Sequence, residues 1–124
     1  MVGLTTDTML KKKESKSRIQ SYSDREAALW EFLKAEGHSS RCTVFPIDST
    51  EGGADTMPDI DALIVSDEPS VIENAIRING LRLKNGLKRF QIVIVPRVLT
   101  EDNVPVSSSR ERRGEKLDPS RFRY

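Results

Sequence analysis

Short continuous apolar runs alternate along this chain with longer stretches in which apolar residues recur at helical spacing. The continuous runs predict buried strands, and the helically spaced stretches predict helices between them. We expect strands at residues 1–5, 41–47, 62–66 and 90–95, and helices at residues 8–13, 23–36, 69–85 and 107–113. This alternation is typical of an α/β fold built from βα units around a mostly parallel sheet.

Several helix boundaries follow from residues that cap helices. Asp7 has the side chain of an N-cap and is expected to cap the first short helix. Ser23 begins a capping box at the start of the second helix. Pro69 suits the first turn of the third helix, with Ser66 or Asp67 as its cap.

The composition limits the chain to one small domain. It has 124 residues and 36% hydrophobic content, which is enough for a single layered core. Because 20 Lys and Arg residues nearly balance 19 Asp and Glu residues, the overall charge favours neither a nucleic acid nor a membrane as a partner. We expect one domain over residues 1–115 and a flexible C-terminal tail over residues 116–124.

Cys42 is the single cysteine in the sequence. It cannot form an internal disulfide and has no second cysteine or nearby histidine at metal-ligand spacing, so it indicates a reducing compartment and a place in the core. No apolar run approaches the ~20 residues that a membrane-spanning helix needs, and the N-terminus lacks a signal-peptide pattern. We therefore expect a cytoplasmic protein.

The stretch from Val106 to Glu115 has the pattern of a phosphate-binding segment. The consecutive hydroxyls of Ser107, Ser108 and Ser109 enter a short helix whose free N–H groups and dipole favour an anion. The arginines that follow can add forked donors for phosphate oxygens. An alternative interpretation is that Ser108 only caps a C-terminal helix.

This stretch resembles the Ile-Ser-Ser-Thr-Arg-Ile-Arg-x-Gly-Glu signature of archaeal pantetheine-phosphate adenylyltransferases, which belong to the nucleotidylyltransferase superfamily. Further segments resemble other motifs of that family, and together they cover nearly the whole chain up to Glu115. They are Val2 to Asp7, Ile19 to Arg25, Leu63 to Pro69, Ile78-Asn79-Gly80-Leu81-Arg82 and Leu99 to Asn103. The resemblance implies a Rossmann-like nucleotidylyltransferase fold.

The superfamily's catalytic His-x-Gly-His motif is not in this sequence, whose single histidine is His38. Residue 1 corresponds to the start of the family's second strand, so we expect the first strand and helix to lie upstream of Met1. The catalytic residues are therefore unidentified. In the implied fold the first strand is central, and without it we expect two half-sheets that are marginal or aggregation-prone unless another segment, or a partner in an oligomer, fills the gap.

The resemblance implies transfer of the adenylyl group of ATP to 4'-phosphopantetheine, which gives dephospho-coenzyme A and pyrophosphate. We expect Ser107, Ser108 and Ser109 to hold the β- and γ-phosphates, and Arg110 and Arg113 to counter the charge on the leaving pyrophosphate. Mg²⁺ is expected with ATP, held mainly by phosphates and water.

Other candidate residues come from the N-terminal loop and from the third helix. Lys16 could reach the α-phosphate, although neighbouring lysines are equal candidates and a solvated loop is the alternative. Arg25 is expected to bind substrate, unless it is simply a surface residue. Asn79 and Arg82 share one helix face and are expected to bind substrate or nucleotide, with a bridge from Asn79 to a neighbouring loop as the alternative.

Two positions depart from the family pattern with different consequences. Glu111 replaces an apolar residue and is expected to change how the short helix packs, whereas Asn103 replaces a turn glycine and tolerates left-handed backbone angles. Two other functions stay open. One is another nucleotidylyltransferase, such as a cytidylyltransferase or an FAD synthetase-like enzyme, and the other is a noncatalytic remnant that binds nucleotide.

Overall fold

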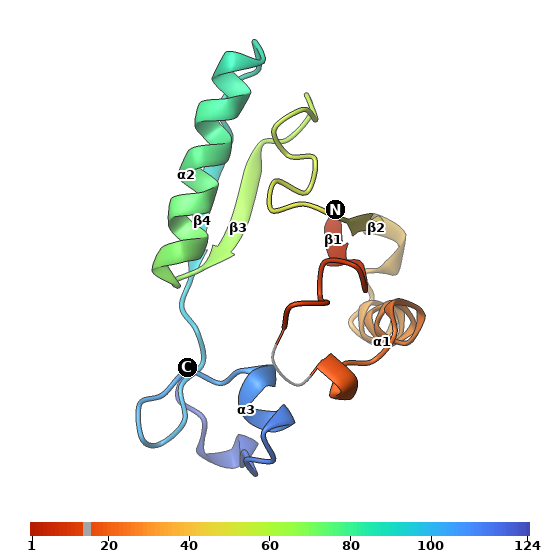
Figure 1. Cartoon of the computed structure of the whole chain (residues 1–124), viewed down its shortest axis with the longest axis vertical. Coiled ribbons are helices and arrows are strands. Elements are labelled where there is room, and N and C mark those ends of the chain that lie inside the picture. Colours follow the sequence, from red (N-terminus) through yellow and green to blue (C-terminus); the bar gives the residue numbers. More distant parts are fainter. Residues whose placement is uncertain (14–15) are drawn as a thin grey trace. The chain divides into compact units, whose positions relative to one another are not determined.

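A computed structural model describes residues 1–13 and 16–124 (Figure 1). The chain divides into two compact units, residues 1–52 (the N-terminal unit) and residues 53–124 (the C-terminal unit). The single domain that the sequence analysis expects over residues 1–115 stays a prediction. Each unit contains its own two-stranded parallel sheet, as expected for two half-sheets.

The sheet of the N-terminal unit pairs β1 (Val2–Thr5) with β2 (Val44–Ile47). Val2 lies opposite Val44 and Thr5 opposite Ile47, and both strands run in the same direction. Two short 3₁₀ helices, η1 (Lys16–Arg18) and η2 (Ser39–Arg41), lie outside the sheet. The predicted strand at 1–5 is confirmed, whereas β2 begins three residues later than predicted because η2 and its cap precede it.

Helix α1 (Tyr22–Ala35) connects the two strands of this unit. Its N-cap is Ser21 rather than Ser23, because the Ser21 hydroxyl accepts a hydrogen bond of 3.2 Å from the backbone N–H of Asp24. The helix ends as predicted at Gly37, where φ is +69° and the next backbone N–H, that of His38, donates to the Leu33 carbonyl at 2.8 Å. The predicted helix at 8–13 was wrong, since these residues form turns.

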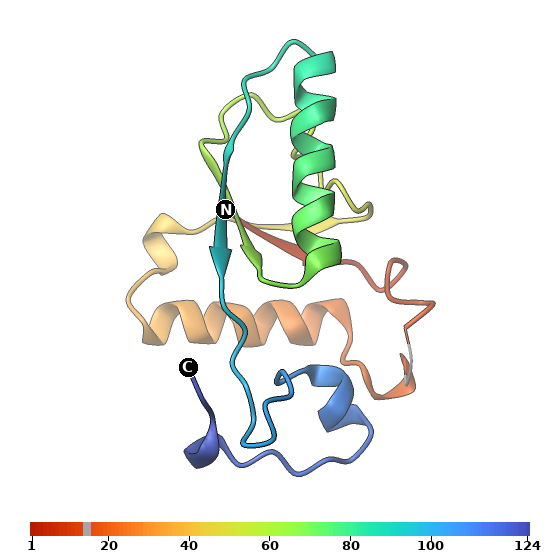
Figure 2. The same ribbon diagram turned by 90° about the vertical axis from the view of Figure 1, so that its left-hand side faces the viewer.

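The C-terminal unit contains a βαβ unit. Strand β3 (Ala62–Ser66) pairs in parallel with β4 (Gln91–Val95), and helix α2 (Pro69–Lys84) connects them and packs along one face of the pair (Figure 2). These elements are confirmed to within a residue. The cap of α2 is Glu68, so the expected caps Ser66 and Asp67 were wrong by one or two residues.

The core of this unit lies between α2 and the sheet. Ala54, Ile78 and Phe90 form its buried cluster. Leu63 and Ile92, which lie opposite each other in the two strands, pack against that cluster. Because side chains alternate along a strand, the intervening residues belong to the other face. That face carries Ile64 at 70% exposure, with Val93 and Val95 also exposed.

The remainder of the C-terminal unit is a turn-rich segment with helix α3 (Ser108–Arg112) and the 3₁₀ helix η3 (Pro119–Arg121). The flexibility that the sequence analysis expects for the tail at 116–124 stays a prediction, and in the structure this segment contacts Leu99. Leu99 and Arg123 exchange backbone hydrogen bonds of 2.9 and 2.8 Å. None of the helices in the described residues is long and apolar enough to cross a membrane.

Candidate functional site

The serine segment, Val106 to Ser109, lies at the start of α3 as predicted. Ser107 is the N-cap, in an extended conformation with φ −150° and ψ 147°, and its hydroxyl accepts from the backbone N–H of Arg110 at 3.4 Å. Ser107 and Ser108 are exposed. The Ser109 hydroxyl accepts a hydrogen bond of 3.0 Å from Nη2 of Arg112. Hydroxyls and the first helical N–H groups therefore meet at one exposed end of a helix.

Arg110 points back from this helix to the turn that precedes it. Its Nε donates to Oε2 of Glu115 at 2.5 Å, and its Nη1 donates to Oγ1 of Thr100 at 2.9 Å and to the carbonyl of Val104 at 3.2 Å. Its Nη2 lies 3.8 Å from Oδ2 of Asp102. The side chain of Arg110 is 12% exposed, so this guanidinium is largely enclosed by its own neighbours.

The carboxylates beside Arg110 are held in their charged form. A hydrogen bond from Thr100, and then the charge of Arg110, lower the pKa of Asp102 below its usual 3.8. The hydrogen bond from Arg110 lowers the pKa of Glu115 below its usual 4.5. Nη2 of Arg113 lies 3.4 Å from Oε1 of the same Glu115. Both arginines that the sequence assigned to phosphate therefore have carboxylate partners in this structure.

Glu111, which replaces an apolar residue of the family signature, is exposed. Its carboxylate therefore stays in water, and the short helix forms without burying it. Arg112, which the sequence analysis did not select, is more enclosed: its Nη2 contacts Ser109, and its buried Nε has no hydrogen-bond partner in the described part of the chain. Its guanidinium donates to a hydroxyl of the serine segment.

Asn79 and Arg82 both bind backbone groups near the amino ends of β3 and β4. The Asn79 amide donates to the carbonyl of Phe90 at 3.0 Å and accepts from the N–H of the same residue at 3.0 Å. This is the loop bridge that the sequence analysis gave as the alternative. Arg82 is fully buried and donates to the carbonyls of Ala54 at 2.6 Å, Met57 at 2.6 Å and Lys88 at 2.8 Å.

Arg82 was predicted to bind substrate or nucleotide, but its guanidinium is already enclosed by the chain. Its guanidinium also lies over the Phe90 ring, 5.3 Å from the ring centre. A substrate could reach Arg82 only by replacing these bonds, and the serine segment follows the opposite, carboxyl end of β4. The structure therefore does not bring Arg82 and the serine segment together, and substrate binding by Asn79 and Arg82 stays a prediction.

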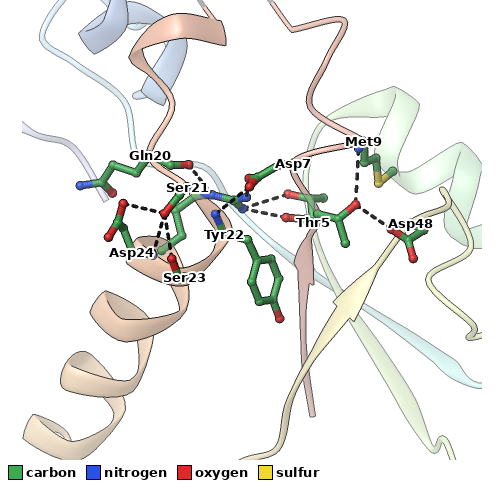
Figure 3. Close-up of polar contacts among 11 residues, drawn as sticks. Thr5, Asp7, Met9, Gln20, Ser21, Tyr22, Ser23, Asp24 and Asp48 are labelled. Atoms are coloured by element: carbon green, nitrogen blue, oxygen red, sulfur yellow. Dashed lines mark hydrogen bonds and ion pairs between the residues drawn. The ribbon is translucent and has the colours of Figure 1, made fainter.

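The end of β1 lies beside the start of α1, where Figure 3 labels Thr5, Asp7 and Tyr22. Arg25 joins these two segments. Its Nη1 donates to the Thr5 carbonyl at 2.8 Å, and its Nη2 donates to Asp7 at 2.7 Å. The other oxygen of Asp7 accepts from the backbone N–H of Tyr22 at 3.1 Å. Asp7 therefore accepts from the first N–H of α1, whose N-cap is Ser21, and does not cap a helix at 8–13 as predicted. The bond from Tyr22, followed by that from Arg25, lowers the pKa of Asp7 below its usual 3.8.

Lys16 lies near this junction, in η1, and is exposed. With Lys11, Asp7 and Gln20 it lines an open cavity of about 420 Å³. An exposed lysine beside a cavity fits the predicted contact with a phosphate, although Lys11 shares that position. The described residues include no cluster of three or more His, Cys, Asp or Glu side chains that could hold a metal ion.

Comparison with known proteins identifies the family. No protein-family model matches the chain. A phosphopantetheine adenylyltransferase of Methanopyrus kandleri is 33% identical over 112 residues, which cover 90% of this chain and 69% of that protein. A phosphopantetheine adenylyltransferase of Methanosarcina mazei is 36% identical over 114 residues, which cover 92% of this chain and 71% of that protein. The chain belongs to the phosphopantetheine adenylyltransferase family.

Membership in the phosphopantetheine adenylyltransferase family confirms the resemblance drawn from the motifs. A crystal structure of a protein with unknown function from Archaeoglobus fulgidus matches the fold with a TM-score of 0.59 at 22% identity, over 75% of this chain and 64% of that one. At this identity the match concerns the fold alone. With the parallel strand pairs, it confirms the predicted Rossmann-like α/β class.

Two polar residues of this phosphopantetheine adenylyltransferase family chain were missed by the sequence analysis. Arg97 donates to Oδ1 of Asp67 at 2.6 Å and so connects the segments that follow β4 and β3. Thr100, which is buried, contacts Arg110 and Asp102. Each follows a predicted strand by a few residues, where parallel sheets carry their sites, and that position is the signal that could have found them.

Proposed function

We propose that this chain acts in the transfer of the adenylyl group of ATP to 4'-phosphopantetheine, which yields dephospho-coenzyme A and pyrophosphate. The observation that carries the proposal is the 33–36% identity to phosphopantetheine adenylyltransferases over about nine-tenths of the chain. The exposed Ser107 and Ser108 at the start of α3 support it, because hydroxyls and the first N–H groups of a helix suit phosphate oxygens.

In this reaction an oxygen of the 4'-phosphopantetheine phosphate forms a bond to the α-phosphorus of ATP. The bond from that phosphorus to the oxygen shared with the β-phosphate breaks, and pyrophosphate leaves with the electron pair. The protein's part is positioning and charge neutralisation. We assign contacts with the β- and γ-phosphates to Ser107, Ser108 and Ser109, with Arg113 nearby, and the α-phosphate contact to Lys16.

Mg²⁺ would accompany ATP and neutralise part of its phosphate charge. Phosphate oxygens and water can supply its ligands, which fits a chain whose described residues offer no three-residue metal cluster. The free Cys42 suits a reducing compartment, and we place the reaction in the cytoplasm.

The described chain is proposed to have little turnover by itself. Its single histidine, His38, has its Nδ1 2.8 Å from Nη2 of Arg41 just after α1, and no His-x-Gly-His motif is in the sequence. Binding of ATP without turnover is therefore the result expected for these residues alone.

The test is pyrophosphate release from ATP and 4'-phosphopantetheine, with CTP as the control nucleotide. It is run on this chain and on the longest reading frame that contains it. Turnover with ATP in the longer form supports the proposal, and turnover with CTP alone would favour a cytidylyltransferase. If neither form turns over while ATP still binds, the noncatalytic alternative replaces the enzyme proposal.

A further inference from the structure

We propose that Arg110 is a positioning residue, which fixes the serine segment against the turn Leu99–Pro105, and that it does not bind phosphate directly. This inference rests on the proposed function, because it concerns how the serine segment is held for its ligand. It also changes the role that the family resemblance suggested for Arg110.

The N–H donors of Arg110 are already directed at neighbouring groups of the chain. The guanidinium of Arg110 donates on its Nε side to Glu115 at 2.5 Å. On its Nη1 side it donates to Thr100 at 2.9 Å and to the carbonyls of Val104 and Pro105 at 3.2 and 3.3 Å. A guanidinium has N–H donors in fixed directions, so donors that point at the turn cannot also form a fork on a phosphate.

Carboxylates surround the charge of Arg110. Asp102 and Glu115 lie on two sides of Arg110, at 3.8 and 2.5 Å. Glu115 also pairs with Arg113 at 3.4 Å, so two carboxylates balance two guanidiniums and leave Arg110 without excess positive charge for a phosphate. A phosphate that approached Arg110 would meet those carboxylates, and with only 12% of the side chain exposed it would find little of the guanidinium to contact.

The bonds of Arg110 connect the residues on both sides of the serine segment. Val104 and Pro105 directly precede the serine segment, and Arg110 directly follows it. The backbone N–H of Arg110 donates to the Ser107 carbonyl at 3.0 Å, and that of Val106 donates to the Val98 carbonyl at 2.8 Å. Arg110 therefore joins both ends of the serine segment and sets the direction of its hydroxyls.

A substitution at Thr100 can distinguish a positioning role of Arg110 from a direct phosphate contact. Thr100 is buried, it accepts from Arg110, and its hydroxyl also contacts Asp102 and the Val104 carbonyl. Removing this hydroxyl leaves every charge in place. If the bond from Arg110 to Thr100 fixes the serine segment, a Thr100→Val variant should speed amide exchange in that segment and lower its affinity for pyrophosphate. If Arg110 only binds phosphate, the variant should change neither.

The experiment compares Thr100→Val, Arg110→Met, Arg110→Lys and the Thr100→Val/Arg110→Met double variant in the full chain. Amide hydrogen exchange of residues 106–111 is measured by NMR, and affinity for inorganic pyrophosphate is measured by calorimetry. We expect each single variant to speed amide exchange of residues 106–111 by about tenfold. The double variant should exchange little faster than either single variant, because Thr100→Val and Arg110→Met break the same connection. Arg110→Lys should rescue neither readout, because a single ammonium cannot make the forked contacts.

Arg121→Met serves as the matched control. Arg121 pairs with Glu101 at 3.0 Å but is 63% exposed and lies outside the connection, so both readouts should match the unsubstituted chain. The proposal is overturned if Arg110→Lys restores pyrophosphate affinity while Thr100→Val leaves exchange and affinity unchanged. Failure of the proposed function is a different result, namely no pyrophosphate release from ATP, and the exchange measurement decides the role of Arg110 even then.

Discussion

Arg82 is a fully buried charge without a carboxylate partner among the contacts that the structure describes for it. Four backbone carbonyls and the face of Phe90 take the place of a counter-ion. A buried cation is tolerated only where its donors are satisfied, and carbonyl oxygens can do this as well as a carboxylate can. Arg82 is therefore a structural residue for the segment that precedes β3.

Replacement of Arg82 by Met is expected to lower the free energy of unfolding by about 2–4 kcal/mol, because it leaves buried carbonyls without donors. Urea unfolding followed by far-UV circular dichroism measures this change. Lys84→Met is the matched control, since Lys84 is exposed on the same helix, and it should stay within about 0.5 kcal/mol of the parent chain. An equal loss in both variants would contradict the role assigned to Arg82.

At the residue scale, sequence reasoning predicted well the features that depend on local backbone chemistry. Asn103 has the positive φ expected of it, +60°, and Ser107 caps its helix. Sequence reasoning predicted less well which groups the long polar side chains bind. Arg82 contacts the chain 28 residues away, at a carbonyl that every residue type carries, so no residue pattern signals the contact.

At the scale of elements, β1 and α1 are joined through Asp7 and Arg25 rather than through a helix at 8–13. Asp7 suited the N-cap of a following helix, but in the structure its carboxylate binds the longer-range partners Tyr22 and Arg25. The elements β3, α2 and β4 were predicted closely, because a continuous apolar run, a Pro at the helix start and an apolar stripe all agree there.

The junction between β1 and α1 should depend on pH. Because the folded-state pKa of Asp7 is lowered, its contribution to stability is present above its usual pKa of 3.8 and is lost as the pH falls through the folded value. The melting temperature should therefore fall between about pH 5 and about pH 2.5, and Asp7→Asn should make that fall shallower.

Thermal melts at a series of pH values, followed by the fluorescence of Trp30 in α1, measure this effect. Other carboxyls with lowered pKa values, such as Asp67 and Glu115, also contribute, so the melting temperature of the variant will still depend partly on pH. A slope that is identical in the variant and the parent chain would show that Asp7 does not contribute.

At the scale of the whole molecule, the notable feature is a parallel strand pair that is covered by α2 on one face. Parallel strands are normally buried on both faces, and the other face carries Ile64, Val93 and Val95. The sequence expectation that these residues alone are aggregation-prone stays a prediction, and this apolar face gives it a physical basis.

The double variant Ile64→Thr/Val93→Thr is expected to reduce self-association, because threonine keeps the strand preference while adding a polar group. Light scattering against protein concentration measures the effect. Ile76→Thr is the control, since Ile76 is 59% exposed but lies on α2 rather than on the sheet. If the control reduces association as much as the double variant does, the sheet face is not its cause.

The bonds that Arg82 makes have a consequence for how this sequence can change over time. They end on main-chain oxygens, which do not depend on residue type. Side chains in residues 55–58 can therefore be substituted without loss of the hydrogen bonds to Arg82. The constraint on substitution falls on Arg82 itself and on the buried Ala54. A segment held in this way can acquire new side chains, and with them new contacts, while its backbone stays where it is.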